Sequence, residues 1–342
     1  MTDARVTIAI PTHQRRESLA QVLRGLARQT CAPGFFSVVV VCDGCSDGTQ
    51  AMLHERQSPF EMLVLELDPA VGPAAARNHA MAQIVTPIVL FLDDDVIPDE
   101  RLVEVHVKHH DQDSEVVVIG PLVPPRRMQQ PWIRWEADTL QKQYEDIEAG
   151  IWAPTPRQFY TGNASVRREH IVAVGGFDPG FKRGEDVDLA FRLQRRGLHF
   201  VFEPRAVGVH IASRSFRSWV AAAYEYGRVE YAMGPVLGER GLVDVKVIEF
   251  QRRNPAVRRT VLFGLRHPSI APAMLAAGGW LARILASVRL WKLARGTYTA
   301  IFEIAYWRGV EQADGGSPTA LRRISAGRQR LRVPSESLSA NR

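Results

Sequence analysis

Short runs of aliphatic and β-branched residues alternate with longer segments of helical spacing along residues 6–92, and this alternation restricts the fold more than any other feature. The short runs have the length and composition of buried strands; they occupy residues 6–10, 38–41, 63–67 and 88–92. The segments with helical spacing occupy residues 18–29, 49–57 and 74–84. Strands that alternate with helices of this length form βαβ units. We therefore predict an α/β fold with a mostly parallel sheet and helices on both of its faces.

Charge divides the chain into an acidic front part and a basic back part. Residues 1–240 carry 26 Lys and Arg against 31 Asp and Glu, whereas residues 241–342 carry 17 against 6. The excess of acidic residues in 1–240 suits the binding of cations, and the excess of basic residues in 241–342 suits a surface that faces anions. The pattern is helical from Ser215 onward and polar and arginine-rich beyond Pro318. We predict an α/β domain at 1–240, a basic helical extension at 241–318 and a flexible arginine-rich tail at 319–342.

No segment of the sequence reads as a secretory leader or a membrane span. A strand-like run begins at residue 6, with no charged region and long apolar core before it. No stretch reaches the roughly 18 uninterrupted apolar residues of a membrane span. The three cysteines, Cys31, Cys42 and Cys45, are too few for a disulfide-stabilised scaffold. We therefore expect a cytoplasmic protein, in which Cys42 and Cys45 are small loop residues rather than zinc ligands.

Three consecutive carboxylates, Asp93, Asp94 and Asp95, directly follow the apolar run at residues 88–92. They repel one another, so holding all three charged is costly without a cation. Ligands of open α/β sheets collect at the carboxyl ends of strands, where these residues stand. Asp93 and Asp95 point the same way in an extended segment and can share a hard divalent ion. The alternative interpretation is a solvated acidic loop.

Polar segments follow or precede other predicted strands and helices in the same way. They occupy residues 11–15, 42–49 and 71–73, and the last precedes a helix that carries Arg77. Converging helix N-termini, Arg77 and a metal on the aspartates would suit a nucleotide diphosphate. The sequence has no Gly-x-Gly-x-x-Gly after its first strand and no Gly-Lys-Ser/Thr loop, so it lacks the main support for a dinucleotide or P-loop site.

These segments resemble the motifs of the family 2 glycosyltransferases, which have the GT-A fold, a Rossmann-like mostly parallel sheet. Residues 7–12 are similar to the opening strand of the family, residues 39–49 to its second motif and Asp93-Asp94-Asp95 to its metal-binding DxD motif. Three further segments resemble the donor-sugar and acceptor-side motifs; they are residues 161–165, 175–178 and 184–189. The resemblance covers residues 5–212 and makes 1–240 the catalytic domain.

The resemblance implies a donor site. Asp43 would contact the nucleotide base, Thr12 would line the same pocket, Arg77 would lie near the base or phosphates, and Asp93 would bond the ribose. Other donor-side positions are Pro11, Arg15, Asp94, Gly162 and Asn163. Cys42 stands where many members have another aspartate, with little expected consequence because Asp43 fills the position for base recognition.

The resemblance also implies a metal and a catalytic base. Asp95 would hold Mn²⁺ or Mg²⁺, together with Asp93 and with His210. Asp186, with Glu185 beside it, matches the base that removes the proton of the acceptor hydroxyl in an inverting transfer. A helix start favours the ionised form of such a carboxylate. The alternative is that Glu185 and Asp186 only cap that helix.

The partners expected are a nucleotide-diphosphate sugar donor and a glycan or glycolipid acceptor of the cell envelope, and no nucleic acid. A nucleic-acid-binding protein fits the basic composition but not the acidic strand ends. A sugar-1-phosphate nucleotidyltransferase and a catalytically silent nucleotide-sugar-binding protein remain as alternative functions. The nucleotidyltransferase should carry a Gly-rich, Arg-containing loop after its first strand, where this chain has Pro11-Thr12-His13.

Three other features have two interpretations each. Residues 270–310 combine apolar helical spacing with tryptophan and arginine, which predicts either a peripheral contact with the inner face of the membrane or a solvated helical subdomain. Trp132, Trp135 and Trp152, in a Pro-rich segment, would either stack on sugar rings or pack in the fold. His106 and His110 could bind metal as an i, i+4 pair, but we interpret them as part of a solvated helix face.

Overall fold

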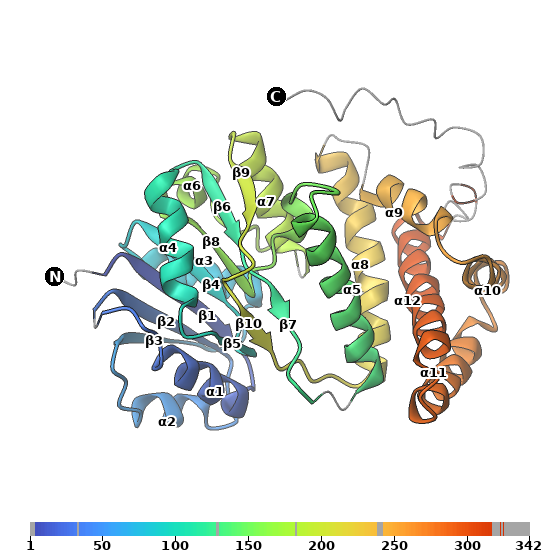
Figure 1. Ribbon diagram of the computed structural model, residues 1–342, viewed down its shortest axis with the longest axis horizontal. Helices are drawn as coiled ribbons and strands as arrows, with labels where there is room; N and C mark the ends of the chain where they lie inside the picture. The colour runs from blue at the N-terminus through green and yellow to red at the C-terminus, as the bar shows by residue number, and fades with distance from the viewer. Residues whose placement is uncertain are drawn as a thin grey trace. The chain divides into compact units, whose positions relative to one another are not determined.

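The computed structural model describes residues 4–32, 34–127, 130–181, 183–237 and 242–316, together with residues 322 and 324. The chain divides into two compact units, Met1–Ser213 and Arg214–Arg342 (Figure 1). The tail predicted at 319–342 lies outside the described residues apart from residues 322 and 324.

A sheet of seven strands forms the centre of the first unit, in the order β3-β2-β1-β4-β8-β6-β9. Its strands are β1 (Val6–Thr12), β2 (Phe36–Asp43), β3 (Glu61–Leu67), β4 (Ile88–Leu92), β6 (Val116–Ile119), β8 (Asn163–Arg167) and β9 (His199–Phe202). β1 pairs in parallel with β2 and β4, and β2 with β3. β8 runs antiparallel to both β4 and β6, while β9 is parallel to β6. The mostly parallel sheet predicted from the sequence is confirmed.

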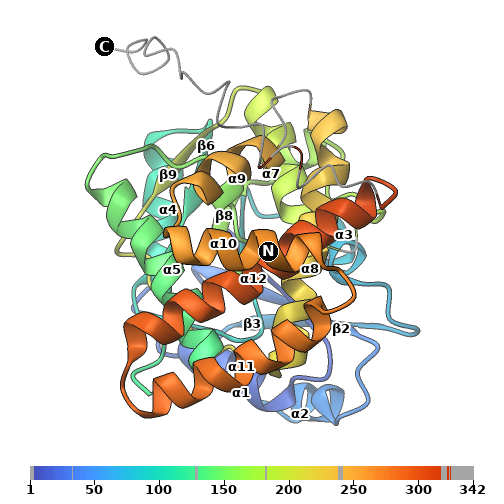
Figure 2. The same cartoon turned by 90° about the vertical axis from the view of Figure 1, so that its right-hand side faces the viewer.

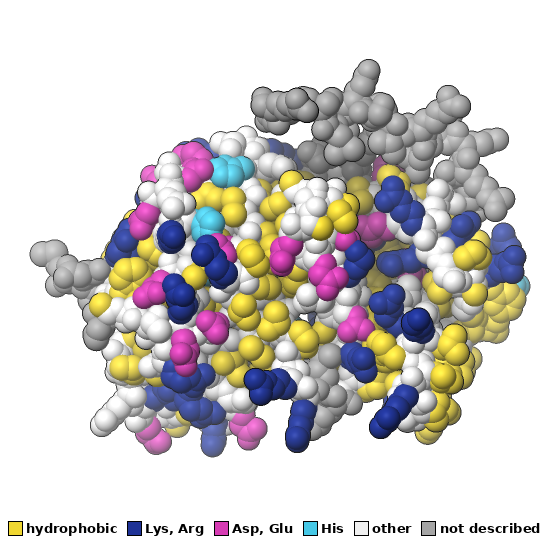
Figure 3. Space-filling model, viewed as in Figure 1, with side chains coloured by type: hydrophobic (Ala, Val, Ile, Leu, Met, Phe, Trp, Pro, Cys, Tyr) yellow, Lys and Arg dark blue, Asp and Glu magenta, His cyan; other side chains and the backbone are white. Residues whose placement is uncertain are grey.

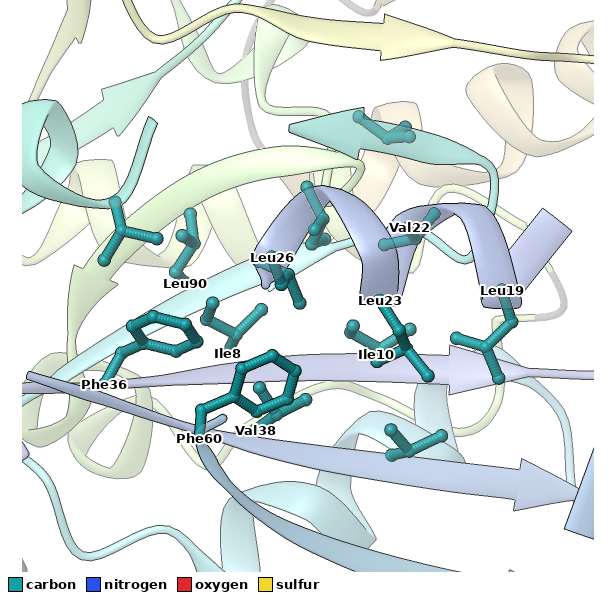
Figure 4. Packing of buried hydrophobic residues seen from close by; sticks show 14 of the residues in the cluster. Ile8, Ile10, Leu19, Val22, Leu23, Leu26, Phe36, Val38, Phe60 and Leu90 are labelled. Carbon is teal, nitrogen blue, oxygen red and sulfur yellow. The ribbon is translucent and has the colours of Figure 1, made fainter. Parts of the chain in front are cut away.

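Successive residues of a strand point to opposite faces of the sheet. Both faces of this sheet carry apolar side chains, and helices cover them. Ile8 and Ile10 of β1 belong to one buried cluster, whereas Ala9 between them belongs to another. Figure 4 shows the first cluster, in which Leu26 and Leu23 of α1 lie over Ile8 and Ile10. Helices α1 (Arg16–Leu26), α2 (Thr49–His54), α3 (Pro73–Gln83), α4 (Leu102–Gln112) and α6 (Arg168–Ala173) each follow a strand, and α7 (Glu185–Arg195) follows α6.

A smaller sheet brings His210 beside the aspartates that follow β4. Its order is β5-β10-β7, formed by Val96–Pro98, Gly208–His210 and Leu122–Val123. β10 is antiparallel to β5 and pairs His210 with Val96, the residue directly after Asp95. A residue far along the chain therefore enters the region at the end of β4.

The Pro-rich segment contains a helix, α5 (Pro131–Glu148), and a short 3₁₀ helix, η1 (Pro156–Gln158). Trp132 and Trp135 lie in the first turns of α5 and are buried. These two side chains therefore pack in the fold, whereas Trp152 is only half-buried.

The described part of the second unit contains the helices α8 (Phe216–Leu237), α9 (Leu242–Gln251), α10 (Pro255–Arg266), α11 (Ala271–Ser287) and α12 (Trp291–Ala313). α8 and α12 approach so closely that a Cβ added to Gly227 would lie 1.9 Å from the carbonyl oxygen of Tyr306. α8 thus lies in the second unit, although the change in charge placed it in the first domain. Where the catalytic part ends stays a prediction. Among the described residues, none of the helices has the length and apolarity that crossing a membrane requires.

Candidate functional site

The carboxyl ends of β1, β2 and β4 bring polar residues from three parts of the sequence to one edge of the sheet. Thr12 ends β1, Asp43 ends β2, and Asp93 follows β4. These strands are neighbours and parallel, so their ends open at the same edge. The sequence predicted that the polar residues at the ends of these strands lie close together, and in the fold they lie at the same edge of the sheet.

Asp94 is held by the segment that follows β1. The hydroxyl of Thr12 donates a hydrogen bond to Asp94 Oδ2 (2.7 Å), and Nη1 of Arg15 lies 3.3 Å from Asp94 Oδ1. Ser18 donates to the backbone carbonyl of Asp94 at 2.9 Å. Burial raises the pKa of Asp94 to about 7, although Arg15 and Thr12 act in the opposite direction. Asp94 is therefore enclosed by the protein rather than directed outward.

Asp95 lies between two basic side chains. Arg15 donates a hydrogen bond to Asp95 Oδ2, and His210 Nε2 lies 3.5 Å from Asp95 Oδ1. Burial alone would raise the pKa of Asp95, but bonding to His210 and then Arg15 lowers it to about 2. Burial would lower the pKa of His210, but Asp95 raises it above its ordinary value. The carboxylate is therefore ionised at neutral pH.

Asp95 and His210 have the chemistry of a divalent-cation site. A carboxylate oxygen and an imidazole nitrogen suit Mn²⁺, and Mg²⁺ is commonly held by one or two carboxylates together with substrate phosphates. Over the described ranges, no three His, Cys, Asp or Glu side chains are grouped so that they could hold a metal. Asp95 and His210 are therefore two candidate ligands, and their binding of a metal ion stays a prediction.

Asp93 does not join that pair but binds Arg77. Nη2 of Arg77 donates to Asp93 Oδ1 and Nη1 donates to Glu185 Oε1, both at 2.9 Å. Arg77 is only 5% exposed, and its guanidinium carbon lies 5.7 Å from the ring centroid of Phe177. One buried cation therefore joins the end of β4 to the start of α7. The role of Asp93 as a metal ligand stays a prediction.

Asp186 stands next to this ion pair in the first turn of α7. Its Oδ1 accepts a hydrogen bond from the backbone N–H of Val187 at 2.8 Å. The N-cap residue of α7 is Gly184, and the helix has no side-chain capping hydrogen bond, so the interpretation of Glu185 and Asp186 as caps was wrong. Burial and the negative charge of Glu185 raise the pKa of Asp186 to about 7, while Arg77 acts to lower it. A carboxyl group with this pKa can both accept and release a proton near neutral pH.

Asp43 fixes the loop before α3. Both of its carboxylate oxygens accept backbone hydrogen bonds, from Val71 (2.6 Å) and Gly72 (2.9 Å). These bonds connect the end of β2 to the N-terminus of the helix that carries Arg77. Sequence reasoning missed this structural role; contact of Asp43 with a nucleotide base stays a prediction.

Gly162 and Asn163 take different positions at the start of β8. A Cβ on Gly162 would lie 3.0 Å from Asp93 Oδ2, so the backbone approaches that carboxylate closely. The side chain of Asn163 is buried and donates to the carbonyls of Ala206 (2.7 Å) and Pro121 (3.1 Å). The amide nitrogen of Asn163 is thus occupied by backbone carbonyls of two loop residues. Direct contact of Asn163 with a donor stays a prediction. Pro11 directly precedes Thr12 within β1 and is half-buried.

His106 and His110 are buried, so their interpretation as a solvated helix face was wrong. His106 donates from Nε2 to Asn163 Oδ1 (3.0 Å), and both histidines bond the Ser165 hydroxyl. Burial lowers the pKa of His106 to about 4 and that of His110 to about 3, so both rings are neutral. The sequence did contain a signal for this role. Asn163 and Ser165 are two positions apart, so in a strand they share one face, where they can bond two histidines that lie one helical turn apart.

Comparison with known proteins gives one family over the region that contains most of this site. Residues 7–175 match the profile of the family described as "Glycosyl transferase family 2". An uncharacterized glycosyltransferase, YfnE, of Bacillus subtilis is 28% identical over 254 residues, which cover 60% of this chain and 64% of that protein. The pre-mycofactocin glycosyltransferase of Mycobacterium tuberculosis is 31% identical over 229 residues, 65% of this chain and 46% of that protein. The chain thus spans about half to two thirds of these relatives.

Two solved structures share the fold over most of this chain. The mannosyltransferase PcManGT of Pyrobaculum calidifontis, in complex with GDP-Man and Mn²⁺, has a TM-score of 0.59 at 21% identity and covers 87% of this chain and 85% of its own. TarS 1–349 of S. aureus, in complex with UDP-GlcNAc, has a TM-score of 0.53 at 16% identity and covers 91% and 92%. The GT-A type of α/β fold predicted from the sequence is confirmed.

Proposed function

Residues 7–175 match the profile of glycosyl transferase family 2, and on that premise we propose that the chain is an inverting glycosyltransferase of this family. It moves a sugar from a nucleotide-diphosphate sugar to an acceptor hydroxyl. The observation that carries this proposal is the buried Arg77, which bonds both Asp93 and Glu185. These two bonds join Asp93, which follows β4, to the residue before Asp186. They support the proposal that the aspartates after β4 and Asp186 act in one site.

The donor side consists of the groups at the ends of β1, β2 and β4. Asp95 and His210 would hold Mn²⁺ or Mg²⁺, which when bound supplies positive charge beside the leaving diphosphate. Arg15 holds Asp95 ionised and oriented. Backbone N–H groups at the N-terminus of α3 favour anionic groups, and Asp43 positions that terminus through Val71 and Gly72.

The acceptor side depends on Asp186. In the proposed reaction its carboxylate takes the proton from the acceptor hydroxyl as the oxygen attacks the anomeric carbon on the face opposite the diphosphate. A pKa of about 7 leaves a substantial fraction of the group ionised at neutral pH. Arg77 moderates the repulsion between Asp186 and Glu185, and Val187 orients the carboxylate through its N–H.

The relatives and structural neighbours indicate the substrate classes. PcManGT and TarS were solved with GDP-Man and UDP-GlcNAc, so a nucleotide-diphosphate sugar is the donor class that we propose. A poly(ribitol-phosphate) β-N-acetylglucosaminyltransferase and a validoxylamine A glucosyltransferase are among the relatives. We propose a glycan or glycolipid of the cell envelope as acceptor, and a cytoplasmic protein that works at the inner face of the membrane.

Two substitutions test donor binding and proton removal separately. Calorimetry with nucleoside diphosphates and Mn²⁺ should show metal-dependent binding that Asp95→Asn abolishes. Asp186→Asn should keep this binding but lose sugar transfer. Wild-type transfer by Asp186→Asn would refute its role as the base.

The products distinguish the alternative functions. A glycosyltransferase releases a nucleoside diphosphate, whereas a sugar-1-phosphate nucleotidyltransferase forms the nucleotide sugar and releases pyrophosphate. A silent binding protein would bind the donor with Mn²⁺ but yield neither product with any acceptor or with water.

A further inference from the structure

Over its second half, helix α11 exposes large apolar side chains and buries small ones, which reverses the usual arrangement of a surface helix. Trp280 is 66% exposed, Leu281 50%, Ile284 53% and Val288, directly after the helix, 57%. These positions follow helical spacing, so they share one face. Leu290 and Leu293, at the start of α12, extend the exposed apolar surface.

The buried face of α11 explains this reversal. Ala271, Gly279 and Ala282 are its buried residues. A Cβ on Gly279 would lie 2.6 Å from the ring of Phe216, and one on Gly278 would lie 3.3 Å from Ile301. Small residues therefore let α11 pack closely within the second unit (Figure 2). Met274 and Leu275 of α11 also pack against the core of this unit, whereas Trp280, Leu281 and Ile284 do not belong to it. Contiguous exposed apolar surface of this kind marks an interaction site.

Cations surround the apolar face, and the sequence around it contains no carboxylate. Residues 251–302 include nine Lys and Arg and not a single Asp or Glu. The guanidinium of Arg283 lies 5.0 Å from the ring centroid of Trp280, within the patch. Arg289, Lys292 and Arg295 follow and are exposed. Figure 3 shows hydrophobic side chains interspersed with Lys and Arg at the lower right, where α11 lies in Figure 1.

We propose that this surface, formed by Trp280, Leu281, Ile284, Val288, Leu290 and Leu293 with the cations Arg283, Arg289, Lys292 and Arg295, docks on an anionic lipid bilayer. Tryptophan and aliphatic side chains enter the boundary between headgroups and acyl chains, while Lys and Arg contact anionic headgroups. A second copy of this chain would bring like-charged surfaces together, which the concentration of cations opposes. The described helices cannot span a membrane, so this contact is peripheral.

Vesicle sedimentation of the full-length protein tests the proposal. The protein should sediment with vesicles of equimolar phosphatidylcholine and phosphatidylglycerol, and much less with phosphatidylcholine alone. The triple variant Arg289→Gln, Lys292→Gln, Arg295→Gln should lower the partition coefficient about 100-fold, since each cation near an anionic surface contributes about fivefold. The double variant Leu281→Ser, Ile284→Ser should lower it at least tenfold through lost apolar insertion.

A matched control separates docking from general loss of surface hydrophobicity. Val85 and Ile151 are exposed apolar residues of the first unit, so Val85→Ser with Ile151→Ser should leave sedimentation unchanged. Equal sedimentation with both vesicle types, or wild-type sedimentation by the Leu281→Ser, Ile284→Ser variant, would overturn the proposal. The proposal would also be overturned if the wild-type protein did not bind vesicles but formed a dimer that the Leu281→Ser, Ile284→Ser variant dissociates. None of these residues belongs to the proposed active site, so loss of docking and loss of transfer chemistry are distinguishable.

Discussion

Replacing Arg77 with methionine should destabilise the first unit because it leaves buried Glu185 without its cation. The guanidinium bonds Glu185, whose side chain is 9% exposed, and Asp93, whose side chain is 39% exposed. Breaking a buried ion pair costs about 3–5 kcal/mol, whereas a partly exposed pair contributes about 0–1 kcal/mol. We therefore expect a loss of about 3 kcal/mol at pH 7, which in a unit of this size lowers the unfolding temperature by about 6–12 °C.

Two further variants check the cause of this loss. Arg101→Met removes an exposed cation 3.9 Å from Glu104 and should change stability by less than about 0.5 kcal/mol. Glu185→Gln should cost much less in the Arg77→Met background than in the wild type, with a coupling energy of about 2 kcal/mol. Thermal unfolding followed by circular dichroism measures all five proteins, namely the wild type, the three single variants and the Arg77→Met, Glu185→Gln double variant. If Arg77→Met lost less than about 1 kcal/mol, or the two substitutions were additive, the buried ion pair would not have the energetic role assigned to it.

The remaining predictions concern protonation and backbone approach. The rate of sugar transfer should rise between pH 5 and 8 with a midpoint of about 7, as Asp186 loses its proton; a flat profile would contradict this. Because the folded-state pKa of Asp186 is raised, its ionisation costs stability as pH rises from about 4 through 7, so Asp186→Asn should raise the unfolding temperature at pH 8 but not at pH 4. Gly162→Ala should weaken donor binding in calorimetry by displacing Asp93, whose Oδ2 would lie 3.0 Å from the new Cβ. Gly227→Ala should lower stability in thermal unfolding by about 2–4 kcal/mol, because its Cβ would lie 1.9 Å from the Tyr306 carbonyl; Gly296→Ala, whose nearest neighbour is 4.0 Å away, is the control and should be neutral or stabilising.

Local patterns in the sequence determined the alternation of strands and helices in the first unit. Runs of β-branched residues predict strands because they suit a sheet buried on both faces. Parallel strands open their carboxyl ends at one edge, so Thr12, Asp43 and Asp93 could be placed together before the fold was known. The antiparallel insertion of β8 between β4 and β6 could not be predicted, because the direction of pairing leaves no local pattern.

Only the tertiary structure decided which side chains bind one another. Arg77 and Glu185 are 108 positions apart, and Arg15 and Asp95 are 80 apart, so their pairing depends on the packing of α3 and α7 and on the end of β4. The same holds for His106, whose partner is on β8, and for α11, whose large residues face outward. Periodicity reports which residues share a face, but the element that packs against that face is set by contacts distant in the sequence.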